Sequence, residues 1–224
     1  MCGRSIFSTN PQQVTKRLAL SVVSLDLATS YNVTPQMHMP VIVANSPNCL
    51  DIIRWGLVPS WAKDERAGYR MIGAPAETVA ARPAYRAAVR YHRCLVPANG
   101  FYERRATGRG KQPYFIHLLD QALFAFAGLY DVWHSPDGSE LWTSTIIICE
   151  ANALMAPIHN RMRVILPRDG EATWLDPQET RAAPVLRLLQ PYPSDAMDAY
   201  PVSTADNNPR NDGPHLVAAR QTDN

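Results

Sequence analysis

The second residue of the chain, Cys2, has the most distinctive chemistry, because it directly follows the initiator Met1. A side chain as small as cysteine permits removal of Met1, which leaves one residue with both a free α-amine and a thiol. The α-amine titrates at pH ~8, so a useful fraction is nucleophilic at neutral pH. An aldehyde meeting such an aminothiol forms an imine, which the thiol closes into a thiazolidine. The competing interpretation is a small residue in a frayed terminus.

Two other side chains have the chemistry to move protons. Glu103 ends the apolar run NGFYE, where partial desolvation would raise its pKa toward acid–base work; a solvated strand-end charge is the competing interpretation. His159 lies at an expected helix–strand junction, which could aim its ring into a cleft; a hydrogen-bonded structural histidine is equally compatible with this position. The other histidines have no comparable context, and we interpret them as surface or packing residues: His38, His92, His117, His134 and His215.

The segment RWGLVPSW contains two tryptophans close to an arginine, a glycine and a proline. Trp55 and Trp61 could form an aromatic platform for unstacked bases, with Arg54 against a phosphate. Tryptophans more often fill protein cores, so this cluster alone is weak evidence for nucleic-acid binding.

The composition is that of one globular domain. The 224 residues are 46% hydrophobic, and the 19 prolines favour a loop-rich or β-rich fold over a helical bundle. The net charge of +2 neither requires nor excludes a nucleic-acid partner, because a groove can be basic while the whole chain is almost neutral.

The four cysteines are widely spaced and form no C-x-x-C pair, which argues against a zinc site or a redox motif. Cys94 and Cys149 lie in apolar runs and are expected to be buried core thiols. No stretch reaches the ~20 apolar residues that a membrane span needs. We therefore expect a monomeric cytoplasmic protein of a reducing compartment, with no membrane association.

Several local signals predict the secondary structure. Asn10-Pro11 indicates a capped helix through about Leu20, and two strands are expected at 40–44 and 49–57. Helical character at 75–93 is interrupted by Pro83, and another helical stretch at about 178–190 is made imperfect by Pro184.

Between residues 94 and 166 the pattern changes to β-branched and aromatic runs separated by turn residues. Asp137-Gly138 is a hairpin signal, and RMRVIL is a further expected strand. The polar tail after Ala205 is expected to be loop or disorder. Strands joined mostly by hairpins, with helices at the flanks, predict an antiparallel α+β fold in a single domain.

Seven segments occur in a fixed order along the chain: MCGR, YNVTP, RWGLVPSWAKD, AETVAARPAYR, CLVPANGFYE, IHNRM and the closing YPVSTADNNPRNDGP. Together they resemble the SRAP family, the "SOS response-associated peptidase" domain of bacteria, phages and eukaryotes. The resemblance implies a barrel-like β-rich core with flanking helices, a domain over residues 1–214 and a flexible tail over 215–224.

Members of this family bind single-stranded DNA and crosslink covalently to abasic sites, whose open-chain sugar is an aldehyde. By resemblance, Cys2 would form the thiazolidine, Glu103 would assist sugar ring opening and proton transfer, and His159 would move protons at the sugar hydroxyl and help reverse the crosslink. Other residues match family positions around the pocket and the DNA strand: Arg4, Asn32, Trp55, Trp61 and Arg161.

The chain departs from the family pattern in two places. Gly73-Ala74-Pro75 stands where the family usually has asparagine-alanine-arginine, so a sugar contact and a phosphate contact are lost. Arg104 replaces the usual tryptophan after the glutamate. It begins a basic patch that could partly compensate, formed by Arg104, Arg105, Arg109 and Lys111. We therefore expect the chemistry to survive with reduced DNA affinity or crosslinking rate.

Two alternatives remain open. A cysteine peptidase would use Cys2 as nucleophile, His159 as base and Glu103 as the group that orients the base. A single-stranded-DNA binder with weakened catalysis would be consistent with Gly73 and Pro75. None of these schemes requires a metal or an organic cofactor, and a protein bound to DNA would associate with the nucleoid.

Overall fold

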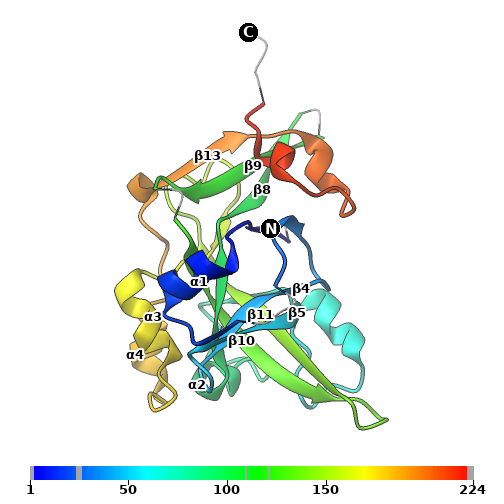
Figure 1. Cartoon of the computed structure of the whole chain (residues 1–224), viewed down its shortest axis with the longest axis vertical. Coiled ribbons are helices and arrows are strands. Elements are labelled where there is room, and N and C mark those ends of the chain that lie inside the picture. The colour runs from blue at the N-terminus through cyan, green and yellow to red at the C-terminus, as the bar shows by residue number, and fades with distance from the viewer. Residues whose placement is uncertain (1–2, 24–26, 109, 121, 221–224) are drawn as a thin grey trace.

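The computed structural model describes residues 3–23, 27–108, 110–120 and 122–220. Cys2, the residue on which the sequence interpretation centres, lies outside these described ranges, as does Arg109. Figure 1 shows a β-rich molecule with short helices at its sides, the α+β architecture expected from the sequence.

The lower part of the molecule in Figure 1 is a small closed barrel. Antiparallel pairing joins its strands in the order β5, β4, β7, β10 and β11, and a parallel pairing of β11 with β5 closes the ring at Thr143↔Arg54 and Ser144↔Trp55. The strands are β4 (His38–Val43), β5 (Cys49–Trp55), β7 (Arg93–Ala98), β10 (Phe124–His134) and β11 (Glu140–Glu150). Their inward apolar side chains form most of the main hydrophobic core.

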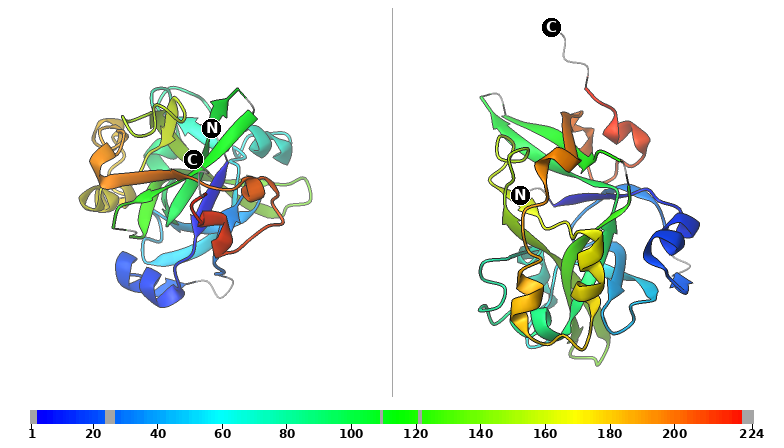
Figure 2. Two further views of the ribbon diagram at one scale, coloured as in Figure 1. Left: turned by 90° about the horizontal axis from the view of Figure 1, so that it is seen from above. Right: turned by 90° about the vertical axis from the view of Figure 1, so that its left-hand side faces the viewer.

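A second sheet covers the upper end of the barrel (Figures 1 and 2). Its order is β13-β9-β8-β1-β3, with every neighbouring pair antiparallel. The strands are β1 (Arg4–Phe7), β3 (Ser30–Val33), β8 (Gly100–Thr107), β9 (Gly110–Leu118) and β13 (Met197–Pro201). Side chains alternate between its faces: Phe101 joins the main core, whereas Tyr102 joins a smaller outer cluster with Ile6 and Leu216.

The remaining elements are short. Three strands extend the barrel sheet: β2 (Val22–Val23), β6 (Gly73–Pro75) and β12 (Arg161–Arg163). The α-helices are α1 (Pro11–Leu18), α2 (Ala88–Tyr91), α3 (Arg168–Leu175) and α4 (Ala182–Leu186). The 3-10 helices are η1 (Glu65–Arg70), η2 (Ser194–Ala196), η3 (Thr204–Asn207) and η4 (Pro214–Val217). Within the described ranges, no helix is long and apolar enough to cross a membrane.

Local signals were informative about several elements. Asn10 caps α1, because its side-chain oxygen accepts a hydrogen bond from the backbone N–H of Gln13 at 2.9 Å. Gly138 adopts a φ of +85° in the turn between β10 and β11, which confirms the Asp137-Gly138 hairpin. Cys94 and Cys149 are buried, as their apolar contexts predicted.

The helical predictions were less accurate. Only residues 88–91 of the segment 75–93 and residues 182–186 of the segment 178–190 are α-helical. Pro83 lies in the turns before α2, whereas Pro184 lies in the first turn of α4, where a proline is tolerated. The helix α3 was not predicted, because Gly170 in its first turn weakens the local helix signal. This helix forms because its buried Trp174 packs against the barrel and donates to the carbonyl of Cys94 at 2.9 Å.

The segment after Ala205 also differs from the predicted loop or disorder, as far as residue 220. It contains η4 and the end of η3, and Asp206 and Leu216 are buried within it. Ala219 forms an isolated β-bridge with Val202. Figures 1 and 2 show this closing segment in red beside the second sheet, at the end of the molecule opposite α2.

Candidate active site around the N-terminal strand

The strand β1 fixes where the N-terminal end of the described chain enters the site. It pairs with β8 through Arg4↔Tyr102 and Ser5↔Phe101. Because this pairing is antiparallel, the chain running back from Arg4 runs in the direction of Glu103 on β8. Gly3 permits a close approach at this point: a Cβ atom there would lie 2.6 Å from Cγ of Pro35.

Glu103 is the last buried residue of β8 rather than the end of the strand, which continues for four residues to Thr107. Its side chain shares the inner face of the sheet with Phe101, because the two residues are separated by two positions. One carboxylate oxygen, Oε1, accepts a hydrogen bond from the backbone N–H of Arg104 at 3.1 Å. The structure therefore holds a desolvated carboxylate on the face toward the barrel, beside the strand that carries the N-terminus.

His159 follows a turn-rich segment that leads from β11 to β12. Its Nδ1 accepts a hydrogen bond from the backbone N–H of Arg161 at 3.0 Å. A neutral imidazole has one donor and one acceptor nitrogen, so this bond assigns the proton of the neutral ring to Nε2. The ring is half-buried, and in this tautomer Nε2, on the side opposite Nδ1, is the donor nitrogen.

Arg163 is a buried cation that the sequence interpretation missed. Its Nη2 donates to the backbone carbonyl of Arg4 at 2.9 Å. Its guanidinium lies over the rings of three core aromatics, at 5.1, 5.2 and 5.1 Å from the centroids of Trp55, Phe101 and Phe126. Aromatic faces attract such a cation, so the core holds a permanent positive charge under the start of β1. The polar residues of RMRVIL were the only available sequence signal for it.

Arg161, a predicted DNA contact, forms a bidentate ion pair with Glu77. The Nη1–Oε1 and Nη2–Oε2 distances are 2.8 and 2.9 Å, and hydrogen bonding to Arg161 lowers the pKa of Glu77. The same guanidinium donates from Nη2 to the carbonyl of Ile148 at 3.1 Å. Ile148 pairs with Pro75 across the parallel β11–β6 ladder. Arg161 therefore presents a cation beside the strand on which the family arginine is missing.

Gly73 and Pro75 are half-buried positions on β6, and both lie on the face opposite the fully buried Ala74. Neither supplies a cation. In the predicted basic patch, Arg105 lies over the ring of Tyr114 at 5.1 Å from its centroid, and Lys111 is exposed.

The two predicted aromatic contacts have different environments. Trp55 is only 1% exposed and donates from Nε1 to the carbonyl of Ile72 at 2.9 Å, so it is a core residue here and presents no ring to a base. Trp61 is 66% exposed and has a ring face available for stacking.

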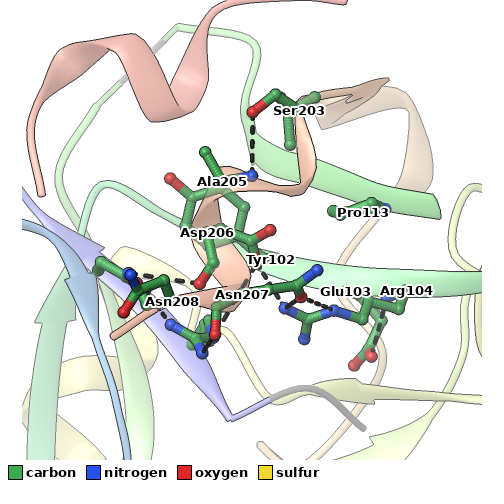
Figure 3. A network of polar contacts seen from close by, with 12 residues as sticks. Tyr102, Glu103, Arg104, Pro113, Ser203, Ala205, Asp206, Asn207 and Asn208 are labelled. Atoms are coloured by element: carbon green, nitrogen blue, oxygen red, sulfur yellow. Dashed lines mark hydrogen bonds and ion pairs between the residues drawn. The ribbon is translucent and has the colours of Figure 1, made fainter. Parts of the chain in front are cut away.

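Asn32, Arg4 and Arg104 lie on the outer face of the second sheet and hold the closing segment. Figure 3 shows Arg104 beside Asp206 and Asn207 of this segment. Asn32 is 1% exposed, and its Nδ2 donates to the carbonyls of Asn211 at 2.8 Å and Asn208 at 3.1 Å. The structure therefore places Asn32 as an anchor for this segment.

Among the residues with described positions, His, Cys, Asp and Glu form no group of three or more that could hold a metal ion. The site thus consists of the N-terminal strand, a buried carboxylate, an oriented imidazole and arginines on both sides of the sheet.

Comparisons with known proteins place this β-barrel protein in a family. The family model described as "SOS response associated peptidase (SRAP)" matches residues 1–209. The chain is 46% identical over 190 residues to the abasic site processing protein YoqW of Bacillus subtilis, covering 84% of this chain and 85% of that one. It is 32% identical to the abasic site processing protein HMCES of Xenopus tropicalis, covering 85% and 66%.

The fold agrees with solved structures. A crystal structure of a protein from Bacteroides thetaiotaomicron matches with a TM-score of 0.88 at 29% identity, covering 98% of this chain and all of that one. A phage-related protein of Bordetella bronchiseptica matches with a TM-score of 0.72 at 27% identity, covering 91% and 95%. The chain belongs to the SRAP family, as its sequence motifs indicated.

Proposed function

We propose that this protein processes abasic sites in single-stranded DNA by capturing the open-chain aldehyde of the base-free sugar on Cys2. The observation that carries the proposal is the antiparallel register of β1 on β8, in which the described chain, followed back from Arg4 to Gly3, runs in the direction of the buried Glu103. Membership of a family whose relatives are named abasic site processing proteins supports it.

The proposed reaction is balanced without a cofactor. After Met1 is removed, the amine nitrogen of Cys2 adds to the aldehyde carbon, and water leaves to form an imine. The sulfur then adds to the imine carbon while the thiol proton is transferred to the nitrogen, which gives a thiazolidine. One water molecule is released overall, and no group is oxidised or reduced.

Two side chains would move the protons in this scheme. Glu103 would take a proton from the sugar hydroxyl and return it to the ring oxygen during ring opening, and would then carry a proton from the attacking amine to the departing water. His159 would donate from Nε2 to a sugar oxygen, because its Nδ1 accepts from Arg161. Arg161 would supply positive charge near the phosphates, and Trp61 a stacking face.

A cysteine peptidase is less compatible with the same geometry. Its base would need an unprotonated nitrogen directed at the thiol, but the Nδ1 of His159 is occupied by the Arg161 N–H and the neutral ring carries its proton on Nε2. We therefore assign His159 as a hydrogen-bond donor to the sugar, through Nε2, in the crosslinking reaction.

The free amine provides a direct test. A variant that retains one residue before Cys2 should lose covalent capture of abasic-site DNA and keep its affinity for undamaged single strands. Cys2→Ser should give only a reversible imine, which borohydride traps. Undiminished capture by the blocked variant would contradict a role for the α-amine, and capture without borohydride by Cys2→Ser would contradict ring closure.

A further inference from the structure

We propose that Asp206 is a positioning residue for the crosslinking reaction, acting from the far side of the sheet through Arg4 and Arg104. This inference rests on the proposed function, because it assigns Asp206 an effect on the rate of that reaction. Figure 3 shows the network in which the carboxylate lies.

Asp206 is a fully buried carboxylate between two arginines. Its Oδ2 accepts from Nη2 of Arg104 at 2.6 Å and lies 4.0 Å from Nε of Arg4. Its Oδ1 has no hydrogen-bond partner within the described part of the chain. Burial raises the pKa of Asp206, while the charges of the two arginines oppose that rise. Burying a carboxylate costs free energy, so the position of Asp206 between two arginines points to a role for its charge.

The first arm of the network reaches the N-terminal strand. Arg4 lies two positions after Cys2, and its Nη1 donates to Oδ1 of Asn32 at 2.6 Å while its Nη2 donates to the carbonyl of Asn207 at 2.8 Å. The guanidinium is thus bound on three sides by the closing segment and β3. This anchors the start of β1 in a single register.

The second arm reaches the proposed proton-transfer residue. Arg104 directly follows Glu103, and its backbone N–H donates to the Glu103 carboxylate at 3.1 Å. Its guanidinium donates to Oδ1 of Asn207, at 2.6 Å from Nη2 and 3.1 Å from Nε. Fixing this side chain on the outer face fixes the backbone that directs Glu103 to the inner face.

A single carboxylate therefore connects the residue two positions after the nucleophile with the residue next to the acid–base group. Asp206 itself lies behind the sheet and is fully buried, so it cannot touch the DNA. Its removal should loosen the relative placement of Cys2 and Glu103 and leave the DNA-binding surface intact. Covalent steps are sensitive to misplacement of about 1 Å, so the effect should fall on rate rather than affinity.

The test compares Asp206→Asn with a matched control. Glu171 is also a buried carboxylate paired with an arginine, since its oxygens accept from Arg17 at 2.7 and 3.0 Å, but this pair joins α1 to α3. We expect Asp206→Asn to lower the crosslinking rate at saturating abasic-site DNA about tenfold, with less than a twofold change in affinity for the undamaged strand. Glu171→Gln should leave both values unchanged.

Amide hydrogen exchange separates this proposal from the proposed function. Exchange at residues 4–7 and 100–104 should accelerate in Asp206→Asn and not in Glu171→Gln. Faster exchange in a protein that never crosslinks would overturn the proposed function and retain the anchoring role. An unchanged crosslinking rate in Asp206→Asn, or an equal loss of rate in both variants, would overturn the positioning role.

A second variant covers the case in which Asp206→Asn does not fold. Arg104→Gln removes the same ion pair from its partly exposed partner and should give the same loss of crosslinking rate.

Discussion

The guanidinium of Arg161 is bound simultaneously by Glu77 and by the carbonyl of Ile148, the β11 residue that pairs with Pro75. Position 75, where the family usually has an arginine, thus lies near the Arg161 cation. The Glu77 carboxylate neutralises the charge of Arg161. This relationship explains how a chain with Pro75 could retain a phosphate contact and why that contact should be weak.

Glu77→Gln should strengthen DNA binding. Without the carboxylate, Arg161 can turn to a phosphate, so we expect severalfold tighter binding to single-stranded DNA and a steeper salt dependence, by about one unit of log–log slope. Titration of a labelled strand over a range of salt concentrations would measure both quantities. Glu179→Gln removes the exposed Arg181 pair and serves as the control. Equal affinities in the two variants would exclude Arg161 as a phosphate contact.

The same ion pair predicts a small dependence of stability on pH. Hydrogen bonding to Arg161 holds the pKa of Glu77 below its ordinary value, so the pair stabilises the fold above the unfolded-state pKa. That contribution is lost as the pH falls through the lower folded-state pKa. Because Glu77 is half exposed, it should amount to about 0.5 kcal/mol or less. The difference in unfolding free energy between wild type and Glu77→Gln, measured with urea, should be present at pH 7 and should shrink as the pH falls below the unfolded-state pKa.

Restoring the family residues on β6 should raise activity. The variant Gly73→Asn with Pro75→Arg places an amide and a cation on the face of β6 opposite the buried Ala74. We expect a higher crosslinking rate and a steeper loss of binding with salt than in wild type. Crosslink yield against salt concentration measures the effect. An unchanged crosslink yield would show that Gly73 and Pro75 do not reduce crosslinking.

Gly3→Ala should disturb the N-terminal strand. The new methyl group would lie 2.6 Å from the Pro35 ring, which has little freedom to move, so the start of β1 must shift. We expect about tenfold slower crosslinking, because the reacting groups are misplaced. Gly108→Ala is the control, since nothing lies within 4 Å of its Cβ position. A wild-type crosslinking rate in Gly3→Ala would show that crosslinking does not depend on the close contact between Gly3 and Pro35.

Thiol labelling should distinguish the cysteines. Burial raises the pKa of Cys149 to about 12 and also raises that of Cys94, so both remain protonated and unreactive at neutral pH. Cys49 is partly exposed. Cys49→Ser should therefore leave Cys2 as the main site of iodoacetamide modification at pH 7.5 and should retain full crosslinking, as peptide mass spectrometry and a gel would show. Loss of crosslinking in Cys49→Ser would contradict the assignment of the nucleophile.

Short-range signals in the sequence predicted much of the fold. The Asn10 cap, the Asp137-Gly138 turn and the alternating strands depend on neighbouring residues, so they could be predicted without the structure. The closing of the barrel depends on the parallel pairing of Ser144 with Trp55, which no local pattern specifies.

The candidate site was less predictable for the same physical reason. Glu103 and His159 were singled out by type and context, and each accepts a hydrogen bond from the backbone of a neighbouring residue, Arg104 and Arg161. The pairing of β1 with β8, which brings the start of β1 beside Glu103, joins segments that are distant in the sequence and has no local signal.

For Asn32, no local signal in the sequence indicated the contacts that its buried amide makes with the closing segment. Arg163 and Asp206 were missed because a buried charge is identified only once its aromatic or cationic surroundings are assembled.

The most direct test of the account is a denaturing gel of the protein incubated with single-stranded DNA carrying one abasic site, beside an undamaged strand. The account predicts a stable shifted band with the damaged strand alone, absent in Cys2→Ala. No band from the wild-type protein, with binding to the undamaged strand retained on a native gel, would contradict covalent capture and leave a DNA-binding member of the family.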